Sequence, residues 1–317
     1  MAILGEFLAI CSVCMCMLFI LVDMGQPWRV LNVILYPTPR SMMFWDMVSL
    51  VGYLALNALI ALATLAAERK CVTPAVWIKP VILLSIPWAI SIHTVTAFLY
   101  SGLPGRTFWL TAILAPRFLA SAFASGPALL ILLCMLVRKL TGYDVGSKAI
   151  RTLAVIVTYA MIINVFFLLM ELFTSFYSQI PTLMEHFDNL YTGSQSQASP
   201  LLFWGRASLV LMALALLLLL LPVTRRNEGL LAAACVVTFV SLWADKGICL
   251  VVSGFIPSPL GAVTPYVPTL PEVLISLAIW ALGALMITIF YKITLSVREG
   301  AETWIEEPAV APLPAVK

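Results

Sequence analysis

Eight long runs of apolar residues divide this chain, and polar residues are concentrated between them. The runs cover residues 4–21, 43–66, 74–100, 113–137, 149–176, 201–221, 230–253 and 270–297. An α-helix rises about 1.5 Å per residue, so roughly 20 apolar residues cross the ~30 Å hydrocarbon core of a bilayer. The pattern therefore predicts an all-α fold, a polytopic transmembrane bundle of about eight spans that occupies residues 1–297.

The two ends of the chain differ in pattern. The first run has no basic segment before it and no small-residue cleavage site, so we expect a retained helix and not a signal peptide. Residues 298–317 are rich in glutamate and proline and carry no apolar periodicity. This composition predicts a disordered, solvated tail.

Charge alternates sharply from one connection to the next. The bases gather in three connections and at the end of the last run, at Arg69, Lys70, Lys79, Arg138, Lys139, Lys148, Arg151, Arg225, Arg226, Lys292 and Arg298. The opposite connections hold few bases, and residues 178–200 and 257–269 hold none. Because basic loops stay in the cytoplasm, both termini are predicted to be cytoplasmic.

Composition narrows the class of protein further. Apolar residues make up 62% of the chain and charged residues only 10%, against about a quarter in soluble domains. The formal net charge of +3 is too small to suggest a nucleic-acid partner, and there is no basic stripe, so we expect none. The lipid bilayer is the expected environment.

The residues that usually hold redox centres are scarce. The seven cysteines are dispersed, with neither a Cys-x-x-Cys-His motif nor a four-cysteine cluster. There are two histidines, and His186 belongs to a polar loop, so a pair of axial haem ligands inside the bundle is not available. We therefore expect no haem, no iron–sulfur cluster and no metal site in this chain.

Ionisable residues inside the runs are costly in lipid and mark functional sites by default. With the predicted orientation, most lie in the outer halves of the helices: Asp23, Asp46, His93, Arg117, Glu171, Arg206, Asp245, Lys246 and Glu272. One interpretation is structural pairing near helix ends, which we favour for Arg206 and Glu272; Asp245 and Lys246 would then belong to two different pairs. The other is a polar pocket open at the outer face, which we favour for His93 and Asp46.

A quinone site requires an apolar slot and groups that hydrogen-bond the ring oxygens and exchange protons. Histidine suits this role because its pKa lies near neutrality and a carboxylate can tune it. Asp46 and Arg117 lie at a depth compatible with His93. Aromatic residues at the same level either line the slot or form an interfacial belt; they are Phe44, Trp45, Trp88, Phe98, Phe108 and Trp109.

Two further patterns concern packing and docking. Ala120, Ala124 and Ala128 recur every four residues and predict close approach of a neighbouring helix. The outer loops contain several prolines and, at residues 185–188, Glu185, His186 and Asp188. These loops either dock a periplasmic partner or are ordered connections.

Several segments together resemble the NrfD/PsrC family of integral membrane subunits. They are Asp-Met-Gly-Gln-Pro-Trp-Arg at 23–29, Tyr-Pro-Thr-Pro-Arg-Ser-Met-Met-Phe-Trp-Asp at 36–46, Ser-Ile-His-Thr-Val-Thr-Ala-Phe at 91–98 and Ala-Pro-Arg-Phe at 115–118. Ser-Leu-Trp-Ala-Asp-Lys at 241–246 is similar too. Within the family the chain is most similar to the DsrP branch of the DsrMKJOP complex, although that branch is identified with ten spans and this chain shows eight runs.

The resemblance implies a quinone-interacting membrane subunit of a respiratory complex in the prokaryotic cytoplasmic membrane. Such subunits exchange electrons between a menaquinone-type quinol and a periplasmic iron–sulfur partner. The family's motif histidine, aspartate and arginine fall on His93, Asp46 and Arg117, the expected quinone-binding residues. Asp23, Glu171 and Asp245 are the expected proton route.

Two other classes compete with this interpretation. A proton- or anion-coupled secondary transporter would show inverted repeats and charges at the midplane, and neither is found. A passive anchor would explain the spans but not the one-sided charge. Direction of electron flow, quinone type and proton pumping are not specified by the sequence.

Overall fold

The computed structural model describes residues 2–142, 146–193, 201–256 and 268–306, and within these ranges it is helical without a β-strand. Eight helical stretches of the described ranges are long and apolar enough to cross a membrane, which confirms the predicted all-α polytopic fold. Seven of them are α1 (Ala2–Asp23), α3 (Met42–Arg69), α4 (Ile78–Ser101), α5 (Leu114–Thr141), α6 (Ser147–Tyr177), α8 (Leu201–Leu220) and α12 (Leu270–Glu306).

The eighth stretch consists of three consecutive segments. It begins as α10 (Glu228–Trp243), continues as the π-helical segment η4 (Ala244–Leu250) and ends as α11 (Val251–Phe255). Short helical turns connect the long helices: η1 (Pro27–Leu31), α2 (Asn32–Leu35), η2 (Thr107–Trp109), α7 (Pro181–Phe187), η3 (Asp188–Thr192) and α9 (Pro222–Arg226). Helix α12 continues to Glu306, past the predicted end of the bundle at residue 297, and residues 307–317 lie outside the described ranges.

Backbone contacts divide the chain into two compact units, whereas the sequence suggested one bundle. Unit 1 contains residues 1–37, 47–89 and 269–317, and unit 2 contains residues 38–46 and 90–268. Helices α3 and α4 contribute to both units.

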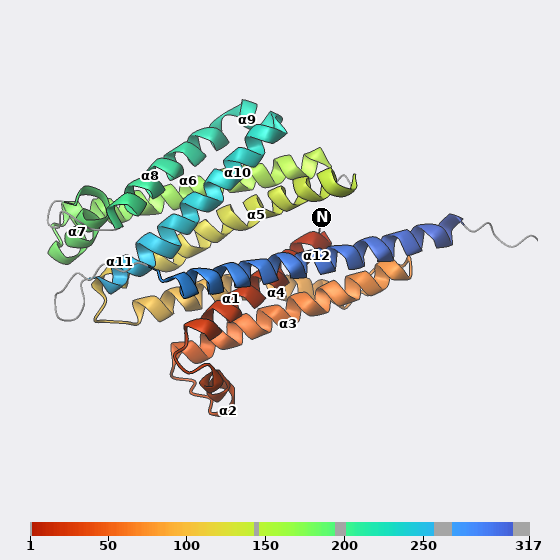
Figure 1. Cartoon of the computed structure of the whole chain (residues 1–317), viewed down its shortest axis with the longest axis horizontal. Coiled ribbons are helices and arrows are strands. Elements are labelled where there is room, and N and C mark those ends of the chain that lie inside the picture. The colour runs from red at the N-terminus through yellow and green to blue at the C-terminus, as the bar shows by residue number, and fades with distance from the viewer. Residues whose placement is uncertain (1, 143–145, 194–200, 257–267, 307–317) are drawn as a thin grey trace, which may run out of the picture. The chain divides into compact units, whose positions relative to one another are not determined.

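Unit 1 is held together by α1, which packs along α12 (Figure 1). The rings of Phe7 and Phe290 stack with their centroids 4.8 Å apart. Around them Ile3, Ile10 and Ala61 form a buried apolar cluster. Helices with apolar side chains on most faces pack in lipid by such close contacts, because burial in a neighbour and burial in lipid are equally apolar.

Unit 2 is built around α5, α6, α8 and α10, which lie side by side (Figure 1). The predicted small-residue stripe of α5 is its packing face, because Ala120, Ala124 and Ala128 are all buried. Asn227 precedes α10, and its side chain caps the helix by accepting hydrogen bonds from the backbone N–H groups of Gly229 and Leu230.

One end of unit 2 carries the α4–α5 connection and the turns α7 and η3, and we call it the α7 end. Trp109 of η2 is fully buried there and donates a hydrogen bond of 3.0 Å to the Leu250 carbonyl. A Cβ atom on Gly254 would lie 2.0 Å from the Trp109 ring, so glycine is required for this packing. Gly205 of α8 likewise lets the helix approach the Leu190 carbonyl of η3. The described turns η2 and η3 are therefore packed against the helices of unit 2.

Candidate functional site

Four ionisable side chains from three helical segments meet near the α7 end of unit 2. Arg117, in the first turn of α5, forms an ion pair with Glu171 of α6 through one guanidinium nitrogen. The other terminal nitrogen donates to both carboxylate oxygens of Asp245 in η4, at 2.8 and 3.0 Å. The Arg117 and Asp245 side chains are only 3% and 2% exposed. An ion pair this buried requires full hydrogen bonding to offset the loss of hydration.

Lys246 completes the cluster. Its ammonium lies 3.2 Å from Oδ2 of Asp245 and 5.8 Å from the centre of the Phe118 ring. The cluster thus contains two cations and two carboxylates, and its formal charge is balanced. The expectation that Asp245 and Lys246 belong to two different pairs is wrong, since Asp245 pairs with Lys246 as well as with Arg117.

Tyr191 of η3 adds a neutral polar group beside the cluster. Burial raises the pKa of the Tyr191 phenol, and the Asp245 carboxylate raises it further. The phenol therefore stays protonated and can donate a hydrogen bond without adding charge.

The π-helical segment explains how Asp245 reaches this position. In a π-helix each backbone hydrogen bond closes over one more residue than in an α-helix, which widens the turn and changes the direction of its side chains. Asp245 and Lys246 lie in the first turn of η4, and both Ala244 and Asp245 are buried. Such turns are frequent at functional sites.

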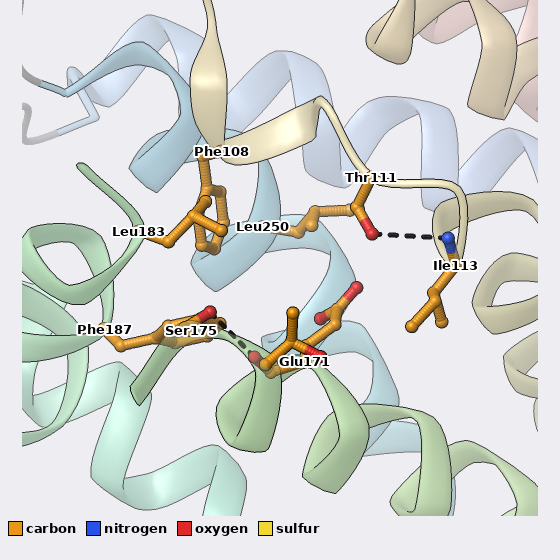
Figure 2. Close-up of a pocket in the computed structure, with 9 residues that line it drawn as sticks. Phe108, Thr111, Ile113, Glu171, Ser175, Leu183, Phe187 and Leu250 are labelled. Atoms are coloured by element: carbon orange, nitrogen blue, oxygen red, sulfur yellow. Dashed lines mark hydrogen bonds between the residues drawn. The ribbon is translucent and has the colours of Figure 1, made fainter. Parts of the chain in front are cut away.

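A pocket opens next to Glu171 (Figure 2). Its cavity volume is about 60 Å³. Figure 2 shows Phe108, Leu183 and Phe187 gathered on one side, Thr111 and Ile113 on the other, and Glu171 between them. The remaining lining residues are Thr174, Ser175 and Leu250.

His186 lies behind the aromatic side of this pocket, in contrast to its predicted place in a polar loop. It is buried on α7, and its ring centroid lies 4.8 Å from that of Phe108. Burial lowers the pKa of His186 to about 4, and a hydrogen bond with the Ser253 backbone opposes this change. The imidazole is therefore neutral at physiological pH and packs against Phe108, which lines the pocket.

The predicted pair of His93 and Asp46 does not appear as a direct hydrogen bond. Asp46, at the start of α3, accepts a hydrogen bond of 2.7 Å from the Thr96 hydroxyl of α4. His93 precedes Thr96 by three residues, so the two lie on the same face of α4 one turn apart. Tyr100, a further turn along this face, packs edge-on against Trp109 and Phe118.

The predicted quinone-binding residues thus have different partners in the structure. Asp46 of α3 is bound by Thr96, which shares a face of α4 with His93, and Arg117 pairs with Glu171 and Asp245. Of the predicted proton route, Glu171 and Asp245 belong to the ion cluster, whereas Asp23 is an exposed residue at the end of α1 in unit 1.

The structural interpretation of Arg206 and Glu272 is confirmed. Arg206 donates to the backbone carbonyls of Tyr191 and Thr192 at 2.9 and 3.3 Å. Glu272 accepts a hydrogen bond of 2.6 Å from the Thr269 backbone N–H at the start of α12, half of a capping box. Both side chains stabilise the ends of helical segments.

The six aromatic residues proposed for a slot have different places. Phe108 lines the pocket and Trp109 is buried behind it. Trp88 donates to the Ser49 carbonyl within unit 1 at 2.9 Å, and Trp45 donates to the Pro39 carbonyl at 2.8 Å. One of the six aromatic residues, Phe108, therefore lines the described pocket.

Sequence reasoning missed Lys246, Tyr191 and His186 as neighbours of the site. The adjacency of Asp245 and Lys246 gave no sign that both face one cluster, because consecutive residues on an α-helix point about 100° apart. The hydroxyls of Thr174 and Ser175 were not singled out either, although Ser175 follows Glu171 by one helical turn.

Comparison with known proteins agrees with the sequence resemblance. The family model described as polysulphide reductase, NrfD, matches residues 1–256. The segments that carry the sequence resemblance, from Asp23 to Lys246, all lie within the matched range.

Two relatives are similar over much of the chain. A protein of Halobacterium salinarum, provisionally named as a membrane component of dimethyl sulfoxide reductase, is 25% identical over 325 aligned residues, which cover 90% of this chain and 72% of the relative. The Hdr-like menaquinol oxidoreductase integral membrane subunit of Archaeoglobus fulgidus is 24% identical over 213 residues. That alignment covers 67% of this chain and 51% of the relative, so the chain spans about half of its length.

Proposed function

Because this chain belongs to the NrfD family of polysulphide reductase membrane subunits, we propose that it is the quinol-reactive membrane subunit of a respiratory electron-transfer complex. Its relatives are named as membrane subunits of redox enzymes, one of them a menaquinol oxidoreductase. In this proposal a menaquinol-type quinol loses two electrons and two protons, and the electrons pass to an iron–sulfur centre on a partner subunit.

The observation that carries this proposal is the Asp46–Thr96 hydrogen bond one turn from His93. A half-buried imidazole one helical turn from the hydroxyl that orients a carboxylate suits proton transfer from a quinol hydroxyl. His93 takes the hydroxyl proton, and Asp46, held by Thr96, receives it or orients the imidazole. Arg117 acts indirectly, by balancing the carboxylates of the ion cluster.

The same proposal includes the orientation in the membrane, the partner subunit and the branch of the family. Both termini are cytoplasmic, so the α7 end faces the periplasm, where an iron–sulfur partner subunit docks. Membership of the DsrP branch, and with it anaerobic sulfur metabolism, is supported by the motif resemblance alone. We expect the quinone to be a bound substrate and the redox centres to lie on partner subunits.

The test is quinol oxidation by the purified complex carrying single substitutions. General acid–base groups contribute about 10²–10⁴-fold to turnover, so His93→Ala is expected to lower kcat at least about 100-fold. Thr96→Val removes one hydrogen bond, worth roughly 1 kcal/mol, so a loss of about fivefold to tenfold is expected. Asp46→Asn is expected to fall between the two.

Thr94→Val is the matched control. Thr94 lies on the same helix, and its hydroxyl donates to the Ile90 carbonyl of that helix. Assembly is checked for each variant by co-purification of the partner subunits. Normal turnover in assembled His93→Ala and Asp46→Asn complexes would remove the proposed site, and solute uptake by the chain alone in vesicles would favour a transporter instead.

A further inference from the structure

We propose that the helical segment between α1 and α3 lies in the surface of the bilayer, with one apolar face among the acyl chains of the leaflet. The segment consists of η1 (Pro27–Leu31) and α2 (Asn32–Leu35), and we call it the interfacial segment. None of its residues is buried in the protein. This inference goes beyond the proposed function, because it depends on the membrane fold and not on quinol chemistry.

The chain holds the interfacial segment at the level of a span end. Helix α1 has 22 residues and is about 33 Å long, so it ends at Asp23 close to the boundary of the ~30 Å hydrocarbon core. Pro27 follows Asp23 by four residues, and a chain of that length reaches at most about 14 Å. Within unit 1, η1 also contacts α1, and α2 lies at the end of α1 away from the N-terminus (Figure 1).

One face of the interfacial segment is apolar and open. Residues three apart lie on the same face of a 3₁₀-helix, so Trp28 and Leu31 of this segment share one. Trp28 is 87% exposed and Leu31 is 53% exposed. Ile34 continues this row and Leu35 lies beside it, and both are more than half exposed. Such a continuous exposed apolar face marks contact with a membrane or with another protein.

The other two faces give the segment its orientation. Arg29 and Asn32, again three residues apart, form an exposed polar row. Val30 and Val33 form the third row and are partly buried. The segment therefore has an apolar face, a polar face and a face covered in part by the protein.

The position and the residue types favour lipid as the occupant of the apolar face. Helices that lie in a membrane surface carry tryptophan and leucine on one face and arginine on the polar face, with the apolar face about 5–10 Å deep. Tryptophan is enriched at the level of the lipid headgroups. An arginine at the same level keeps its guanidinium near the phosphates while its stem covers apolar surface. Trp28 and Arg29 place both residue types at the start of the segment, within reach of the end of α1.

The test is spin-label accessibility in the purified complex, reconstituted into vesicles of phosphatidylcholine and phosphatidylglycerol. Leu31→Cys, Asn32→Cys and Val33→Cys each place one label on one of the three faces, in a background with Cys16→Ser and Cys71→Ser, which removes the exposed native thiols. Electron paramagnetic resonance compares collisions of each label with oxygen and with a water-soluble nickel chelate. Oxygen concentrates among acyl chains, whereas the chelate is excluded from them.

The three faces predict three different results. The ratio of oxygen to nickel collisions should be about tenfold higher for Leu31→Cys than for Asn32→Cys, since only the first label lies among acyl chains. The label of Val33→Cys should collide less with both reagents, because the protein covers part of this face. The background without an added cysteine gives the blank, and thermal unfolding establishes that each variant is folded. Leu35→Cys reports the same face if Leu31→Cys does not fold.

Two results would overturn the lipid assignment. Free collision of the Leu31→Cys label with the nickel chelate would place the apolar face in water. Collision with neither reagent, as at a covered position, would show that a protein partner occupies the face in place of lipid. Quinol turnover is not part of this measurement, so failure of the proposed His93 site and failure of this inference are distinguishable.

Discussion

His186 shows how a single buried side chain couples the stability of the α7 end to pH. Its imidazole packs against Phe108 and is held by a hydrogen bond with the Ser253 backbone. Because burial lowers the pKa from 6.5 to about 4, the folded protein binds a proton less readily than the unfolded chain does. Stability from the neutral imidazole is complete above pH 6.5 and is lost as the pH falls from 6.5 toward 4.

We therefore expect the protein to be less stable at pH 5.0 than at pH 7.5, by about 2 kcal/mol from this residue alone, since one pKa unit corresponds to about 1.4 kcal/mol. The measurement is the thermal unfolding midpoint of the purified protein at the two values. His186→Gln should remove this part of the pH dependence. An equal fall in the midpoint with and without His186 would contradict the assignment.

At the scale of elements, Arg117 joins α5 to α6 and to η4 by two ion pairs. A side chain of one helix that pairs with side chains of two other helical segments fixes the relative positions of the three segments. In lipid no water is available to replace a lost partner. The buried cluster therefore defines how these helices meet at the α7 end. Arg138 provides a contrast on the same helix, because its ion pair with Glu228 is exposed.

Arg117→Met is expected to destabilise the protein by about 3–5 kcal/mol, because it removes the cation of the buried Glu171 and leaves Asp245 with Lys246 alone. Arg138→Met should cost less than about 1 kcal/mol, as exposed pairs do. Thermal and denaturant unfolding in detergent give both values. Adding Glu171→Gln and Asp245→Asn to Arg117→Met should restore part of the loss, and equal effects of the two arginine substitutions would refute the role of the cluster.

Elements and their contacts differ in how far the sequence predicts them. The eight spans were predictable because hydrophobic length is set by the bilayer and needs no knowledge of neighbours. The packing face of α5 was predictable because its alanines recur every four residues, the spacing that lets a neighbouring helix approach. The partners of Asp245 and Lys246 were not, since the pairing depends on a π-helical turn that no local pattern of residues 244–250 reveals. The burial of His186 likewise depends on how α7 packs against η2.

At the scale of the whole molecule, the asymmetric distribution of bases predicts one orientation in the membrane. The connection between α3 and α4 is basic and contains Cys71, which is exposed. The connection between α1 and α3 contains the exposed residue Gln26 and belongs to the opposite side. The division into two units was not visible in this charge pattern, because both units alternate in the same way.

We expect a membrane-impermeant maleimide to label Cys71 in inside-out vesicles and not in intact cells. A cysteine placed at Gln26, in a variant with Cys71→Ser, should show the reverse. Mass shift of the purified chain reports the labelling. Labelling of Cys71 from the outside of intact cells would invert the orientation and would place the Glu171 pocket on the cytoplasmic side.

The π-helical segment η4 has a consequence for how this chain is compared with its relatives. A π turn holds one residue more than the α turn that it replaces, so it corresponds to a one-residue insertion in a continuous helix. A relative without the insertion keeps the flanking α10 and α11 positions only if its alignment carries a one-residue gap within residues 244–250. Without that gap, its counterparts of Leu250 and Gly254 would be assigned to positions rotated by about 100° around the helix.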